Sequence, residues 1–172
     1  MKPKLKKTLR ILLFITIVVI NIGCDQISKD VVRKNVKDNE IINLVDDNFI
    51  ITKVENTGAA MSLGENLPTE LKTILFQVMP VLVLLFLFIT SIRERKISDI
   101  KITALCFIAG GIGNIYDRII YGSVTDFMYR NLGFTKTGIF NAADASVFIG
   151  TLLIFLELII FNRNSSKSIG VL

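Results

Sequence analysis

The sequence predicts an α-helical membrane protein with four transmembrane helices, a small extracytoplasmic β-sheet and a short extracytoplasmic loop before the last helix. Three observations lead to this fold class. The 172-residue chain is 51% hydrophobic and its mean hydropathy is positive, which is unusual for a soluble domain. Four mostly apolar stretches reach the length of about 20 residues that crosses a bilayer. Clusters of lysine and arginine flank these stretches, where basic residues set the orientation of a membrane protein.

The predicted spans cover residues 8–27, 73–92, 100–120 and 139–161. Pro80 lies inside the second span and is expected to kink it, which neighbouring helices can tolerate. The basic clusters place both chain termini and the turn after the second span on the cytoplasmic side. Because no linker separates the spans, we interpret residues 1–172 as a single integral membrane domain.

The predicted orientation leaves residues 30–71 and 121–138 outside the membrane. Two β-rich pieces of the first outer segment, 41–45 and 49–54, are separated by Asp46-Asp47-Asn48. This pattern predicts a small antiparallel sheet. A lone hairpin is marginally stable in water, so we expect the sheet to rest on the membrane or on the helix bundle.

The composition excludes several classes of site. The chain contains no histidine, which rules out Ser-His-Asp and Cys-His catalysis and every His-ligated metal site. Cys24 and Cys106 lie far apart in apolar stretches, so we interpret both as buried thiols. The basic residues flank the spans and form no nucleic-acid face, although the net charge is +5. We therefore expect no metal, no cofactor and no nucleic-acid partner.

Two aspartates stand out because they lie at the outer ends of the last two predicted spans. Asp126 is flanked by Val124 and by Phe127-Met128-Tyr129, an apolar stretch expected to lie against the membrane. Asp144 is in the first turn of the fourth span, where the helix dipole also favours a carboxylate. Ionisable groups at membrane depth usually mark function, and two carboxylates suffice for acid–base chemistry on a peptide bond. The predicted orientation places both at the same membrane face.

Polar residues near these aspartates share helix faces. Asp25 and Lys29 are four residues apart and can pair, either within a site or as an ordinary interfacial ion pair with Lys29 pointing outwards. Asn56 offers donors and an acceptor, and Gly58 permits close backbone approach, although the segment alone would read as an ordinary turn.

The last two spans add a second set of polar residues. Asn114 and Arg118 are four apart on one face, while Asp117 and Arg118 point in different directions and need separate partners. Arg118 could hold a carboxylate or a lipid head group, or serve as an interfacial anchor. Asn141 lies three residues before Asp144, so it can cap the fourth helix and orient a neighbouring carboxylate.

Five short motifs follow one another along the chain: Asp25-Gln26-Ile27-Ser28-Lys29, Asn56-Thr57-Gly58-Ala59-Ala60, Gly110-Gly111-Ile112-Gly113-Asn114-Ile115-Tyr116-Asp117-Arg118, Val124-Thr125-Asp126-Phe127 and Phe140-Asn141-Ala142-Ala143-Asp144. In this order they resemble the motifs of the lipoprotein signal peptidase (signal peptidase II) family. The resemblance covers nearly the whole chain and implies an aspartic endopeptidase of the bacterial cytoplasmic (inner) membrane. Such an enzyme removes signal peptides from diacylglyceryl-modified prolipoproteins by cutting before the lipidated cysteine.

The resemblance also implies roles for individual residues. Asp126 and Asp144 fall on the catalytic dyad, which would share one proton and activate water at the extracytoplasmic face. The family positions that line or support the site are matched by Asp25, Lys29, Asn56, Gly58, Asn114, Arg118 and Asn141. Expected partners are diacylglyceryl-prolipoproteins, membrane lipids and globomycin-type inhibitors. Met61 and Thr125 depart from the pattern, since phenylalanine and valine are common at those positions.

Two other hypotheses remain open on the sequence alone. The acidic residues and Arg118 could form a proton or ion relay in a small transporter, although they cluster at one face instead of crossing the membrane. Alternatively, Ile22-Gly23-Cys24 is close to a lipoprotein cleavage box, which would make the chain a lipoprotein anchored through Cys24. Asn21 speaks against that reading, because an aliphatic residue is expected three positions before the cysteine.

Overall fold

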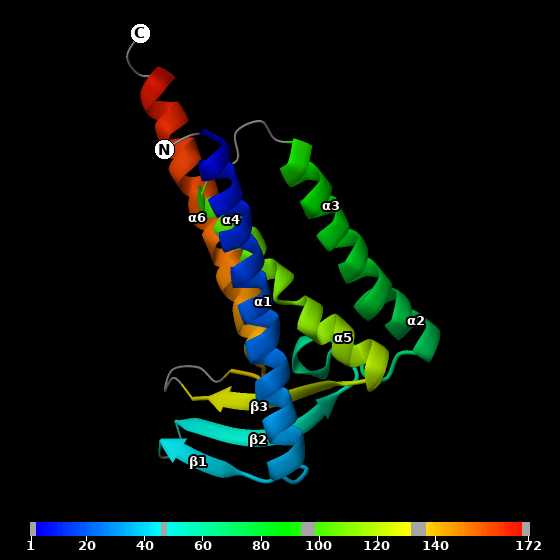
Figure 1. Ribbon diagram of the computed structural model, residues 1–172. Helices are drawn as coiled ribbons and strands as arrows, with labels where there is room; N and C mark the ends of the chain where they lie inside the picture. Colours follow the sequence, from blue (N-terminus) through cyan, green and yellow to red (C-terminus); the bar gives the residue numbers. More distant parts are fainter. Residues whose placement is uncertain (1–2, 46–47, 94–98, 132–136, 170–172) are drawn as a thin grey trace.

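The computed structural model describes residues 3–45, 48–93, 99–131 and 137–169 (Figure 1). Long helices form one end of the molecule and a small sheet forms the other. In chain order the elements are α1 (Pro3–Asn35), β1 (Ile42–Val45), β2 (Phe49–Asn56), the 3₁₀ turn η1 (Ala60–Ser62), α2 (Thr69–Thr73), the π-helical turn η2 (Ile74–Val78), α3 (Met79–Arg93), α4 (Asp99–Ala109), α5 (Ile112–Ile120), β3 (Val124–Arg130) and α6 (Ala142–Ile169).

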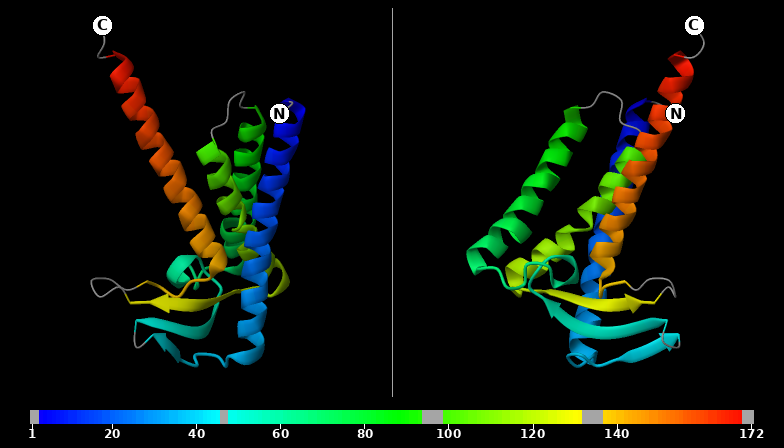
Figure 2. Two further views of the ribbon diagram at one scale, coloured as in Figure 1. Left: turned by 60° about the vertical axis from the view of Figure 1, so that its left-hand side comes forward. Right: turned by 180° about the vertical axis from the view of Figure 1, so that it is seen from behind.

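Two helical segments in the described part of the chain are long and apolar enough to cross a membrane, Thr69–Thr90 and Ala142–Ile159. They correspond to the second and fourth predicted spans, whereas the four-span arrangement itself stays a prediction. α1 contains the first predicted span but continues to Asn35, for 33 residues in all. At about 1.5 Å per residue it is roughly 50 Å long, which exceeds a hydrocarbon core of about 30 Å. Its last turns therefore reach the sheet (Figure 2).

The disturbance that Pro80 predicts in the second span takes the form of a π turn. Proline has no N–H to offer the carbonyl of Phe76, four residues earlier in the helix. The helix widens over this stretch, and the N–H of Met79 donates to the carbonyl of Ile74, five residues earlier, as in a π-helix. The wider turn connects α2 to α3 without ending the helix, as single π turns generally do.

The prediction of one continuous third span over 100–120 is wrong. The helix breaks at Gly110 and Gly111, and α5 leaves in a different direction from α4 (Figures 1 and 2). Paired glycines are a common cause of sharp helix breaks. Gly110 also has no room for a side chain, because a Cβ there would lie 2.6 Å from Oγ of Ser146 on α6. The break turns α5 aside from α4, toward α2 and the start of β3 (Figure 1).

The predicted antiparallel sheet is present, but its third strand was missed. The strand order is β1-β2-β3, and β3 comes from the stretch that the sequence analysis placed as a loop against the membrane. Val124, Thr125, Asp126 and Phe127 are all buried in this strand. Asp126 pairs with Val54 in the register, so it lies on a strand and not at a helix end.

The buried interior is unusually polar, while apolar side chains cover the outside of α3 and α6. Such an arrangement fits helices that face lipid instead of packing into a water-soluble core. Cys24 is exposed on α1, so the prediction that it is a buried thiol is wrong. The side chain of Cys106 lies outside the described residues.

Gly150 should be essential for the packing of α6 on α4. A Cβ at this position would lie 2.6 Å from the carbonyl oxygen of Ala104 and 2.8 Å from Cγ1 of Ile108. Gly150→Ala should therefore lower the free energy of unfolding in detergent by about 1–3 kcal/mol, as overpacking does. Gly23→Ala is the matched control: nothing lies within 4 Å of the new Cβ, so it should be neutral or slightly stabilising. Equal stability of the two variants would contradict the close helix contact.

Candidate functional site

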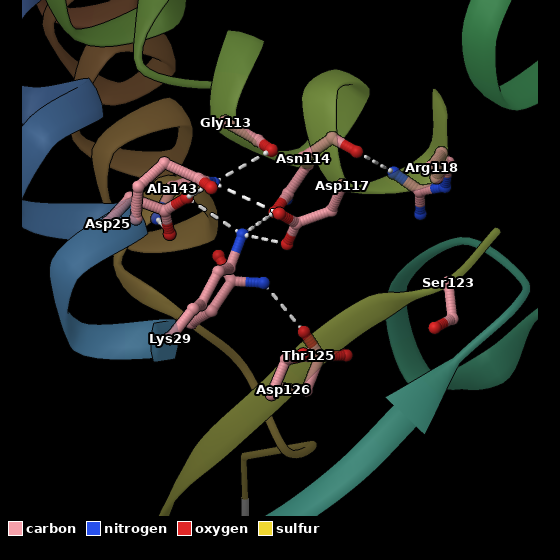
Figure 3. Close-up of polar contacts among 12 residues, drawn as sticks. Asp25, Lys29, Gly113, Asn114, Asp117, Arg118, Ser123, Thr125, Asp126 and Ala143 are labelled. Carbon is pink, nitrogen blue, oxygen red and sulfur yellow. Dashed lines mark hydrogen bonds and ion pairs between the residues drawn. The ribbon is translucent and has the colours of Figure 1, made fainter. Parts of the chain in front are cut away.

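A fully buried ammonium group occupies the centre of the polar interior. Nζ of Lys29 lies 2.8 Å from Asp25 Oδ2 and 2.9 Å from Asp117 Oδ2, and it donates to Oδ1 of Asn114 at 2.7 Å (Figure 3). The side chains of Lys29 and both aspartates are 0% exposed. Two donors of the ammonium make hydrogen bonds, to Asp25 and Asn114, and the contact with Asp117 is an ion pair. Lys29 does not point outwards, so the interpretation as an ordinary interfacial ion pair is wrong.

Asp25 connects this ion cluster to the start of α6. Its Oδ1 accepts a hydrogen bond of 2.9 Å from the backbone N–H of Ala143, which is otherwise an unpaired donor in the first helical turn. Gly113 on α5 leaves the space for the carboxylate, since any Cβ there would collide with it. Asp25 therefore holds α1, α5 and α6 together at one point.

Asp144 and Asn141 form a reciprocal capping box at the start of α6. Oδ1 of Asn141 accepts the N–H of Asp144 at 3.0 Å, and Oδ2 of Asp144 accepts the N–H of Asn141 at 3.1 Å. The predicted cap is thus confirmed. Oδ1 of Asp144 also accepts a 2.7 Å hydrogen bond from Nδ2 of Asn114. Asn114 consequently links the Lys29 ammonium on one side to the Asp144 carboxylate on the other.

Asp126 receives an amide on each oxygen. Nδ2 of Asn141 donates to Oδ1 at 2.6 Å, and Nδ2 of Asn56 donates to Oδ2 at 2.9 Å. Asn141 contacts both carboxylates, because its backbone N–H also donates to Oδ2 of Asp144. The two aspartates, 18 positions apart in the sequence, are therefore joined through one asparagine.

Burial raises the pKa of Asp126 to about 6. The residue is only 4% exposed, and removal from water is the main cause because it disfavours the charged carboxylate. The negative charge of Asp144 raises the pKa further. Hydrogen bonds from Asn56 and Asn141 and the charge of Lys29 act in the opposite direction. Asp126 can therefore hold a proton at a pH where an ordinary aspartate is ionised.

The charges in the cluster do not balance when every group is ionised. Carboxylates outnumber cations by one, since Asp25, Asp117, Asp126 and Asp144 face Lys29, Arg33 and Arg118. A single added proton makes this set neutral. Unbalanced charge is costly at low dielectric, which acts in the same direction as the burial that raises the pKa of Asp126.

A tight loop after β2 covers one side of this cluster. Oδ1 of Asn56 accepts the N–H of Gly58 at 2.8 Å, and Nη2 of Arg118 donates to the Gly58 carbonyl at 2.6 Å. Gly58 has no room for a Cβ, which would lie 2.6 Å from the Leu63 carbonyl oxygen. Met61 adopts a left-handed conformation (φ 57°), and its side chain is 74% exposed. Arg118 thus fixes the loop and acts on both Asp126 and Asp144 through its charge.

The structure brings all nine predicted site residues into one connected cluster, although their roles stay a prediction. It adds Arg33 and Asp117, which the sequence analysis did not assign to the site. Asp117 is fully buried and lies 3.1 Å from Nη2 of Arg33 as well as close to Lys29. A signal for Arg33 existed, because Asp25, Lys29 and Arg33 are spaced by four and share a face of α1.

Comparison with known proteins identifies the relatives of this chain. A family model described as signal peptidase (SPase) II matches residues 17–160. The lipoprotein signal peptidase of Borreliella burgdorferi (strain ZS7) is 38% identical over 159 residues, which cover 89% of this chain and 91% of that protein. That of Borrelia duttonii (strain Ly) is 33% identical over 165 residues, covering 92% and 94%. A solved bacterial membrane enzyme superposes with a TM-score of 0.80 at 27% identity, over 88% of this chain and 90% of that one.

The raised pKa of Asp126 predicts a specific pH dependence of folding stability. The folded chain binds more protons at Asp126 than the unfolded chain does between about pH 4 and about pH 6. Stability from this group is therefore lost as the pH rises through that window. Asp126→Asn removes the titration, so the variant should gain stability relative to the parent by up to about 3 kcal/mol between pH 4 and pH 7.

Unfolding in detergent at a series of pH values would measure this difference. Asp30→Asn, on the exposed surface of α1, is the matched control for loss of a carboxylate. The pH-dependent part of the difference is diagnostic, because the substitution also alters the hydrogen bonds to Asn56 and Asn141 at every pH. A difference that stays constant from pH 4 to pH 7 would contradict a raised pKa.

Proposed function

The chain belongs to the signal peptidase II family, and on that premise we propose that it is an aspartic endopeptidase that processes lipoproteins. Its substrates are diacylglyceryl-modified prolipoproteins, and it cuts before the lipidated cysteine to release the signal peptide. Asp126 and Asp144 form the catalytic dyad. The observation that carries this proposal is the pair of carboxylates that both accept hydrogen bonds from Asn141, one of them with a pKa raised to about 6.

The dyad shares one proton at rest, and we assign that proton to Asp126. This residue is the one with the raised pKa, because it is buried on β3. We assign the role of base to Asp144, which lies in the first turn of α6 and accepts hydrogen bonds from Asn114 and from the N–H of Asn141. The two carboxyl groups therefore begin the reaction in different protonation states, as acid–base catalysis requires.

Peptide-bond hydrolysis follows from these two states. The Asp144 carboxylate takes a proton from water, which attacks the scissile carbonyl carbon. Asp126 donates its proton to the carbonyl oxygen, which gives a gem-diol. As the C–N bond breaks, the proton on Asp144 passes to the leaving amine, and a hydroxyl of the gem-diol returns a proton to Asp126. Exclusion of water from the cluster strengthens the hydrogen bonds that hold both groups in place.

The proposed site lies at the extracytoplasmic face of the bacterial cytoplasmic membrane, with both chain termini in the cytoplasm. A signal peptide enters with its N-terminus inside, so its cleavage site reaches the outer face. The exposed apolar surfaces of α3 and α6 suit contact with lipid. The diacylglyceryl group of the substrate can then stay in the bilayer while the peptide enters between the helices and the loop after β2. Globomycin-type inhibitors are expected to occupy the same place.

Replacement of either member of the dyad should abolish cleavage. Asp126→Asn and Asp144→Asn should each lower the rate of cleavage of a diacylglyceryl-modified prolipoprotein by about a thousandfold or more. Purified protein in detergent, with mass spectrometry of the products, gives both the rate and the cut position. Asp30→Asn should cleave like the parent. A folded parent chain that does not cleave the prolipoprotein, or a dyad variant that keeps full activity, would overturn the proposal.

Arg118 should matter more for substrate binding than for chemistry. Its guanidinium holds the Gly58 carbonyl at 2.6 Å and so fixes the loop that faces the dyad. Arg118→Ala should raise KM by about tenfold, a loss of roughly 1.4 kcal/mol, while kcat changes less. Arg130→Ala, an exposed arginine at the end of β3, is the control. Unchanged KM in the Arg118 variant would contradict this role.

A further inference from the structure

Thr125, the residue immediately before Asp126, makes side-chain hydrogen bonds to two different elements. Oγ1 of Thr125 accepts a 2.7 Å hydrogen bond from Nε of Arg33 on α1 and donates one of 2.8 Å to Oε1 of Glu55 on β2. The second oxygen of Glu55 accepts from the hydroxyl of Ser123 at 2.6 Å. Thr125 is 0% exposed, so its hydroxyl depends on these partners. A valine of the same shape could make neither bond.

Arg33 connects this threonine to the buried ion cluster. Its Nη2 lies 3.1 Å from Oδ2 of Asp117, and the same carboxylate oxygen lies 2.9 Å from the Lys29 ammonium. The guanidinium also stacks over the ring of Tyr121, 4.1 Å from its centroid. Arg33 is therefore held in one orientation, and so is the hydroxyl that it contacts.

These contacts form a closed ring that includes both residues of the dyad. Through hydrogen bonds and ion pairs the path runs from Asp126 to Asn141, Asp144, Asn114, Lys29, Asp117, Arg33 and Thr125. The peptide bond between Thr125 and Asp126 completes it. Successive side chains of a strand point to opposite faces, so Thr125 acts on its neighbour Asp126 through the backbone of strand β3. The contact between Arg33 and Thr125 joins strand β3 to helix α1.

We propose that Thr125 is a positioning residue, whose hydroxyl, held by Arg33 and Glu55, sets where strand β3 presents Asp126 to Asp144. The inference rests on the proposed function of the dyad. Two carboxylates that share a proton and act on one carbonyl must keep a fixed separation, and a misplacement of about 1 Å can cost a hundredfold in rate. A strand that is held by hydrogen bonds at the neighbouring residue supplies that constraint without contacting the substrate.

The test compares isosteric and conservative variants of the full chain. Thr125→Val removes the hydroxyl and keeps the shape, whereas Thr125→Ser keeps the hydroxyl. Thr151→Val makes the same chemical change on the exposed face of α6, where the hydroxyl bonds only the Val147 carbonyl. For each, kcat and KM for a diacylglyceryl-modified prolipoprotein are measured in detergent beside the unfolding midpoint.

Thr125→Val should lower kcat by about tenfold with KM changed less than about twofold, and Thr125→Ser should restore most of the loss. Glu55→Gln, which weakens the acceptor of the Thr125 hydroxyl, should show a smaller fall of the same kind and serves if Thr125→Val folds poorly. A lower unfolding midpoint with parental kcat in Thr125→Val would mean a structural role alone and overturn the proposal. So would equal impairment of Thr125→Ser. An inactive parent chain would overturn the proposed function as well, whereas an active parent with an unimpaired Thr125→Val overturns only this inference.

Discussion

The buried ammonium of Lys29 is the interaction on which the rest of the site depends. Taking a charge of this size out of water costs several kcal/mol unless every donor finds a partner. Here the partners come from α1 and α5, and one of them, Asn114, passes the contact on to Asp144 on α6. Lys29 has these partners in the arrangement of α1 and α5 that the structure shows. That arrangement fixes where the carboxylates lie before any substrate is present.

The site is assembled from common structural devices. Asn141 and Asp144 form a capping box of the kind that begins many helices. Here the side chain of Asn141 also donates to the second carboxylate, that of Asp126. The glycine pair Gly110-Gly111 ends one helix and aims the next at the cluster. Burial of these polar groups has a cost in stability, which is usual where side chains are placed for chemistry.

The sequence predicted the helices better than it predicted the site's framework. Hydropathy found the second and fourth spans, because length and apolarity decide membrane crossing. It could not see the break at Gly110, since glycine leaves the hydropathy of the stretch almost unchanged. It misread β3, because Phe127-Met128-Tyr129 is apolar whether it packs in a sheet or lies against lipid. The contact of Asn56 with Asp126 joins residues 70 positions apart, and only the family resemblance brought them together in advance. Arg33 repeats the four-residue spacing of Asp25 and Lys29, so closer reading of that face would have found it.

The first turn of α6 carries a further consequence. The N–H of Ala143 donates to the Asp25 carboxylate, and the N–H of Asn141 donates to that of Asp144. The side chain of Asn141 donates to Asp126. A change in the ionisation of these acids must alter the shielding and the solvent exchange of the amide protons of Asn141, Ala143 and Asp144. One end of a long helix thereby works as a built-in spectroscopic probe, in which NMR of three backbone amides reports the charge state of the cluster without any label on a ligand.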